Sequence, residues 1–132
     1  MVDDDRTIVY LFEKLLHLRG HEILAKAYDG EQAVEMYKNF KVIPDIILMD
    51  HRMPRKDGLA VSKEILAFNR DCKIIFVCAD ESTKEKASEL GVAYFLVKPI
   101  SIMDLLIVIE QVLSGSPEKE PTMIKHQTIL PQ

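Results

Sequence analysis

The chain has 132 residues, about the size of one domain, a formal net charge of −4 and 48% apolar residues. This composition is ordinary for a globular protein, and the negative charge argues against non-specific binding to nucleic acids or anionic membranes. No apolar run approaches the ~20 residues that span a bilayer, and no signal peptide opens the sequence, so we expect a cytoplasmic protein.

Strands and helices are expected to alternate along the chain. Apolar runs predict strands at residues 1–2, 23–27, 46–50, 73–78 and 94–97. Apolar residues at helical spacing predict helices at residues 7–18, 30–40, 58–68, 82–91 and 101–113. Such alternation with short connections implies right-handed crossovers and a doubly wound parallel sheet.

Most of the helix ends carry capping residues. Acidic and hydroxyl side chains favour helix starts, and glycine favours the position just after a helix. The expected caps are Asp5, Gly20, Asp29 with Gln32, the box from Ser82 to Glu85, Gly91 and Ser101.

The first predicted strand is unusually short. Only Met1 and Val2 precede the acidic residues Asp3 to Asp5, whereas the other strands have about four or five residues. Either the sequence lacks its natural start, or the strand is truncated. A truncated strand would leave neighbouring backbone groups without partners in the sheet.

The two cysteines and the C-terminal segment allow two further predictions. Cys72 and Cys78 would be about 20 Å apart on one strand, beyond disulfide reach, so we expect reduced thiols and no zinc site. From residue 114 the sequence becomes rich in Ser, Gly, Pro and charge. We expect one domain at residues 1–113 and a linker or flexible tail at 114–132.

Four predicted strands are followed by residues with polar or reactive side chains, namely Asp3 to Asp5, Asp50, Cys78 and Lys98. The carboxyl ends of parallel strands meet at one edge, where ligands bind. Clustered carboxylates repel each other unless a cation relieves them, and Mg²⁺ is held by carboxylates, waters and phosphate oxygens. With a lysine beside them, such residues suit phosphoryl transfer onto a carboxylate. Each motif alone has a simpler explanation, such as a helix cap or a turn.

These motifs are similar to those of a known family. Asp3-Asp4, Asp50 with Met53-Pro54 and Gly58, and Lys98-Pro99 resemble the signature of receiver domains of two-component response regulators, of the chemotaxis-regulator type. The likeness covers residues 1 to about 113. It implies an α/β, flavodoxin-like fold with five helices and a five-stranded parallel sheet in the order 2-1-3-4-5.

The resemblance also implies roles for individual residues. Asp50 would be the phospho-acceptor, and Lys98 would pair with the phosphoryl group. Asp3, Asp4, Asp50 and the backbone carbonyl of Arg52 would bind Mg²⁺ or Mn²⁺.

The resemblance assigns the response to phosphorylation to other positions. Phe95 would be the rotating aromatic that reports phosphorylation to a face formed by the fourth helix, fifth strand and fifth helix. The backbone of Ala79 would face the phosphoryl group, and the Lys98–Pro99 peptide bond would be cis.

Cys78 departs from the family pattern, which has Thr or Ser at this position. A thiol is a weaker donor than a hydroxyl, so we expect phosphorylation to survive and its coupling to Phe95 to weaken or change. Arg52 and Asp80 stand where family members tune hydrolysis of the acyl phosphate. His51 is expected to be a loop residue that faces away from the site.

The sequence therefore predicts a response regulator, a phosphoprotein that a histidine kinase or phosphotransfer protein phosphorylates on Asp50 with Mg²⁺. Its task would be signalling to a downstream protein rather than enzymatic turnover, without direct nucleic-acid binding or membrane insertion. A degenerate receiver that binds partners without phosphorylation is the alternative. A small Mg²⁺-dependent phosphatase would need a further general acid near the nucleophile, and position 52 is Arg.

Overall fold

The computed structural model describes residues 1–2 and 5–114. Asp3, Asp4 and residues 115–132 lie outside the described residues, and so do the predictions made for them: two of the expected metal ligands and the tail. The helices and strands of the described part are α1 (Arg6–Leu18), α2 (Gly30–Lys38), β1 (Ile47–Asp50), α3 (Gly58–Phe68), β2 (Ile74–Cys78), the short 3₁₀ turn η1 (Glu81–Thr83), α4 (Lys84–Leu90), β3 (Tyr94–Val97) and α5 (Ile102–Ser114).

The three strands form a parallel sheet in the order β1-β2-β3. Pairing continues beyond β1 through single bridges, because Val2 pairs in parallel with both Met49 and Ala27. The strand predicted at residues 23–27 is wrong as a strand, since Ala27 is its one residue that bridges. The expected order of five strands stays a prediction, because the described residues contain three strands.

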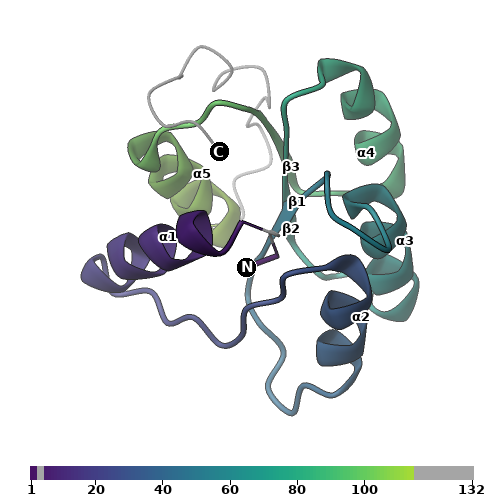
Figure 1. Ribbon diagram of the computed structural model, residues 1–132, viewed down its shortest axis with the longest axis horizontal. Helices are drawn as coiled ribbons and strands as arrows, with labels where there is room; N and C mark the ends of the chain where they lie inside the picture. The colour runs from purple at the N-terminus through teal and green to yellow at the C-terminus, as the bar shows by residue number, and fades with distance from the viewer. Residues whose placement is uncertain (3–4, 115–132) are drawn as a thin grey trace.

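Helices cover both faces of the sheet (Figure 1): α1 and α5 lie on one side, and α2, α3 and α4 lie on the other. Each layer has its own group of buried apolar side chains. Phe76 and Phe95 belong to the group beside α2, α3 and α4. Ile75 and Leu96 belong to the group beside α1 and α5, as expected when neighbouring strand residues point to opposite faces.

Most of the predicted helix caps are confirmed. The Asp5 carboxylate accepts hydrogen bonds from the backbone N–H groups of residues 7 and 8. Asp29 accepts from the N–H of Gln32, whose side chain accepts in return from the N–H of Tyr28. The N–H of residue 104 donates to the hydroxyl of Ser101. The two predicted glycine stops, at positions 20 and 91, have φ of +87° and +100°.

The capping box predicted from Ser82 to Glu85 is wrong. The segment begins with η1, whose cap is Asp80, and α4 begins only at Lys84. Thr83 occupies the N-cap position of α4, but its side chain makes no capping hydrogen bond. Its hydroxyl group is used in a tertiary contact instead.

A cavity of about 470 Å³ lies at the amino end of the sheet, away from the carboxyl ends of the strands. Met1, Val2 and the stretch 46–48 line it, together with parts of α1, α2 and α5. The Met1 amino group donates to the carbonyl of Ala25, and burial lowers its pKa to about 6. This end of the sheet is therefore less tightly filled than the central strands.

Two further predictions from the sequence concern the cysteines and the absence of a membrane-spanning segment. Cys72 and Cys78 are both buried and free, so the prediction of reduced thiols is confirmed. In the part of the chain that the structure describes, none of the helices combines the length and apolarity needed to cross a bilayer.

Candidate functional site

Asp50 and Lys98 meet at the carboxyl end of the sheet. The Oδ1 atom of Asp50 and the Nζ atom of Lys98 are 2.5 Å apart, and both side chains are largely buried. Asp50 ends β1 and Lys98 follows β3, while β2 lies between them. The ion pair therefore reaches across the end of β2. The Lys98–Pro99 peptide bond is cis.

A buried carboxylate is costly unless it is paired, so this arrangement depends on both partners. Asp50 is fixed through its backbone, because its N–H donates to the carbonyl of Val2. The N–H of Lys98 donates to the carbonyl of Cys78. Both charged residues are thus placed by the ladder of the sheet rather than by a loose loop.

Gly58 allows the loop after Asp50 to fold back against β1. A Cβ atom at this position would lie 2.5 Å from the carbonyl oxygen of Asp50. The N–H of Gly58 donates to the carbonyl of His51, which closes the loop. A larger residue would push either the loop or Asp50 away. The close approach of the loop to β1 therefore requires a glycine at this position.

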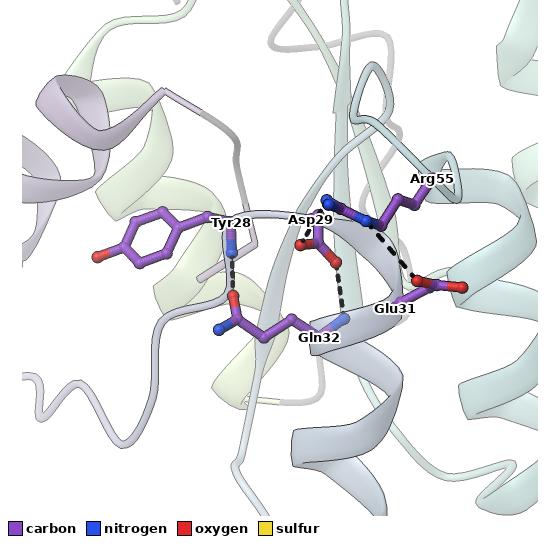
Figure 2. A network of polar contacts seen from close by, with 5 residues as sticks. All are labelled: Tyr28, Asp29, Glu31, Gln32 and Arg55. Carbon is purple, nitrogen blue, oxygen red and sulfur yellow. Dashed lines mark hydrogen bonds and ion pairs between the residues drawn. The ribbon is translucent and has the colours of Figure 1, made fainter.

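The same loop is held against the start of α2 (Figure 2). Arg55, which has a positive φ of 70°, contacts the carboxylates of Asp29 and Glu31 at 3.2 and 3.8 Å. Exposed ion pairs of this kind contribute little. The closer constraint is steric: a Cβ atom on Gly30 would overlap the backbone carbonyl of Lys56.

A polar hollow of about 480 Å³ opens in front of this loop, lined by His51, Arg52, Met53, Asp57 and Asp80. Hydrogen bonds from the side chain and backbone of Ser82 hold the pKa of Asp80 below its usual range, and the charges of Arg52 and His51 add to this effect. Arg52 and Asp80 both line this hollow, and no direct ion pair joins them among the described residues. Their role in tuning hydrolysis stays a prediction.

His51 does not face away from the site, contrary to the prediction. It lines the hollow, and its ring lies 5.6 Å from that of Phe76, measured between centroids. Phe76 in turn stacks on Phe95 at 5.7 Å with an interplanar angle of 14°. Sequence reasoning missed this row of rings because the three residues come from separate segments, the loop after β1 and the strands β2 and β3. Phe95, the expected rotating aromatic, is buried in this structure.

Comparison with known proteins identifies the family of this chain. The family model described as "Response regulator receiver domain" matches residues 1–110. This chain belongs to that family. Among curated relatives, it is 34% identical to the chemotaxis protein CheY of Bacillus subtilis, over 86% of this chain and 95% of that protein.

Two other comparisons extend this result. The receiver is 36% identical to the transcriptional regulatory protein PdtaR of Mycobacterium tuberculosis over 86% of its own length, but it spans only 55% of PdtaR. In a crystal structure of the CheX-CheY-BeF3-Mg+2 complex from Borrelia burgdorferi, a chain with 30% identity matches with a TM-score of 0.79, covering 84% of each chain. The receiver thus has the CheY-like, flavodoxin-like fold with five helices and a parallel sheet.

Cys78 lies at the end of β2, where the Asp50–Lys98 pair crosses. It is buried, and its Sγ atom is 3.4 Å from the N–H nitrogen of Asp80 and 3.3 Å from the hydroxyl oxygen of Thr83. Ala79 follows as an exposed bend. The receiver therefore has a thiol at this position that is already bonded to the segment leading into α4.

The described residues of the receiver also fit part of a magnesium site. A carboxylate from Asp50 and a backbone carbonyl from Arg52 are oxygen ligands of the kind that Mg²⁺ prefers. Arg52 also lines the open polar hollow described above. Within residues 1–2 and 5–114, no cluster of three or more His, Cys, Asp or Glu side chains could hold a metal.

Proposed function

We propose that this receiver accepts a phosphoryl group on Asp50 from a phosphohistidine of a histidine kinase or phosphotransfer protein. A carboxylate oxygen of Asp50 attacks phosphorus in line, an O–P bond forms, and the P–N bond to the imidazole breaks. The imidazole leaves with the bonding electron pair and takes a proton from solvent. The observation that carries this proposal is the buried contact between Asp50 and Lys98; the residues that follow Asp50, His51 and Arg52, line an open polar hollow.

Lys98 supports this step through its charge. Its ammonium group lies close enough to Asp50 to contact a phosphoryl oxygen once the acyl phosphate has formed. Mg²⁺, when bound by Asp50, the carbonyl of Arg52 and the acids Asp3 and Asp4, would supply further positive charge against the phosphoryl oxygens. Asp50, held by the sheet, presents its carboxylate without a large rearrangement.

The output would be a change in protein binding at the face formed by α4, β3 and α5, reported by Phe95. This role rests on membership of the family. The same proposal includes a cytoplasmic location, a sheet order of 2-1-3-4-5, and a tail after the receiver domain that was expected from residue 114, which the structure places at the end of α5. The PdtaR relatives are about twice as long as the matched region, so any further output activity belongs to the same proposal.

A degenerate receiver, which binds partners without phosphorylation, is the second candidate. Cys78 favours it, because it replaces the hydroxyl expected at this position. The intact Asp50–Lys98 pair opposes it.

Beryllofluoride with Mg²⁺ distinguishes these functions. NMR shifts centred on Asp50 that spread to Phe95 support the switch, and Asp50→Asn should abolish them. An unchanged spectrum with beryllofluoride, together with no phosphorylation by any tested kinase, would support the inert module. Repeated turnover of phosphomonoesters would instead support a phosphatase.

Arg52 and Asp80 offer a test of how the acyl phosphate is protected. Their opposite charges flank the hollow through which water would approach. Arg52→Ala should shorten the lifetime of phosphorylated Asp50, measured by loss of radiolabel. An unchanged lifetime would remove Arg52 from this role.

A further inference from the structure

The loop between β1 and α3 contains a backbone turn that is unfavourable for the residue at its centre. The N–H of Lys56 donates to the carbonyl of Pro54 at 2.8 Å, and Arg55 between them has a φ of 70°. This is the form of γ-turn with a positive central φ, which is rare and strained. A residue with a Cβ atom seldom adopts such a φ, whereas glycine adopts it readily. Arg55 therefore needs contacts outside the turn to hold this conformation.

The start of α2 provides those contacts (Figure 2). The Arg55 guanidinium lies 3.2 Å from the carboxylate of Asp29 and 3.8 Å from that of Glu31. The Asp29 carboxylate is itself fixed, because it also caps α2. Next to the turn, the carbonyl of Lys56 occupies the space that a side chain at Gly30 would fill. The turn is thus held by charge on one side and by close packing on the other.

The other end of the loop is fixed to the sheet. The N–H of His51 donates to the carbonyl of Val77, and the carbonyl of His51 accepts from the N–H of Gly58. Only residues 52–54 lie between this anchor and the turn, and the last of them is a proline, whose φ is fixed. The carbonyl of Arg52, which is expected to bind Mg²⁺, belongs to this short span. Its direction therefore depends on both anchors.

We propose that Arg55 is a positioning residue that directs the backbone carbonyl of Arg52 toward Mg²⁺ by holding the turn against α2. Without the Arg55 side chain, the turn relaxes to a negative φ, and the span that carries the carbonyl shifts with it. Exposed ion pairs are weak, so the expected change in Mg²⁺ affinity is a few-fold rather than a complete loss. This inference rests on the proposed Mg²⁺-dependent phosphorylation of Asp50 and adds a residue to which the family likeness gave no role.

Two substitutions at position 55 separate the turn from the charge. Arg55→Ala and Arg55→Gly remove the same positive charge, but only alanine keeps the strain of a positive φ. Titration of the full chain with Mg²⁺, followed by NMR, should show roughly threefold weaker binding in Arg55→Ala than in the parent chain. Arg55→Gly should bind Mg²⁺ more tightly than Arg55→Ala. Loss of the positive charge alone would favour a cation, and so predicts tighter binding in both variants.

The backbone amide of Lys56 gives a readout that needs no metal, because its N–H closes the turn. Without Mg²⁺, its hydrogen exchange should be roughly threefold faster in Arg55→Ala than in the parent chain, since local opening becomes easier. Arg55→Lys, which keeps the charge, should stay close to the parent. The matched control, Arg70→Ala, removes an exposed arginine in the loop after α3 and should change neither exchange nor Mg²⁺ affinity.

The outcomes separate this inference from the proposed function. Mg²⁺ binding in Arg55→Ala as tight as in the parent chain, or weaker binding in Arg55→Gly than in Arg55→Ala, would overturn the inference. A parent chain that binds Mg²⁺ and is phosphorylated on Asp50 would then leave the proposed function intact. Failure of the parent chain to bind Mg²⁺ would overturn both.

Discussion

The two ends of the sheet are built differently. At the carboxyl end, Asp50 and Lys98 form a buried ion pair, and the backbone of the following loop packs within van der Waals distance of β1. At the amino end, an apolar cavity of about 470 Å³ remains beside Met1 and Val2. The comparison shows where precise placement is needed: polar groups that act together are held by close packing, whereas the opposite end tolerates unfilled space.

Loss of the lysine should have the largest effect on function. Lys98→Met keeps much of the side-chain volume but removes the charge beside Asp50. We expect the rate of phosphorylation by a small phosphodonor to fall on the order of a hundredfold, as for loss of one preorganised charge-stabilising group. Stopped-flow or radiolabel assays measure this. The matched control is Lys63→Met, an exposed lysine on α3, which should leave the rate unchanged.

Crowding the loop should damage both stability and phosphorylation. Gly58→Ala would place a methyl group 2.5 Å from the carbonyl oxygen of Asp50. We expect the free energy of unfolding to fall by about 1–3 kcal/mol, measured by urea denaturation, together with slower phosphorylation. Gly20→Ala also strains a positive φ but lies in open space. It should lose stability without loss of phosphorylation, and equal phosphorylation in both variants would contradict the steric role of Gly58.

The amino end should make stability depend on pH. Burial lowers the pKa of the Met1 amino group to about 6, from about 8 in an unfolded chain. Between these values the unfolded state binds more protons, so stability should rise from pH 6 to pH 8 by about 2 kcal/mol. Denaturation at several pH values tests this for the chain that retains Met1. Acetylation of the amino group should flatten that part of the profile, and an unchanged slope would refute the assignment.

Filling the cavity should have the smallest effect. Ala25 lines it, and Ala25→Val adds two methyl groups there. We expect a gain of about 0.5–1 kcal/mol in the free energy of unfolding and no change in phosphorylation. Ala67→Val on the exposed side of α3 should give no such gain. A loss of stability in Ala25→Val would show that the cavity cannot accept this volume.

Local chemistry made much of the fold predictable. Asp5, Asp29 and Ser101 cap helices because a short polar side chain satisfies N–H groups within four residues, whatever surrounds them. The apolar runs ending at Asp50 and Cys78 predicted the bounds of β1 and β2 to within one residue. The prediction failed at residues 23–27, where only Ala27 bridges to a neighbour, because a strand depends on pairing with another segment and not on its own apolar pattern alone.

The residue sequence alone determined which side chains end the strands, and hence that an aspartate, a thiol and a lysine share one edge. Only the tertiary structure decided what these groups touch. The Thr83 hydroxyl bonds Cys78 instead of α4, and His51 turns toward Phe76 and the mouth of the site. In both cases several partners are available, and the packing of the surrounding elements decides which of them the side chain contacts. A sequence pattern indicates which residues share an edge of the sheet, but not which of several available partners each side chain contacts.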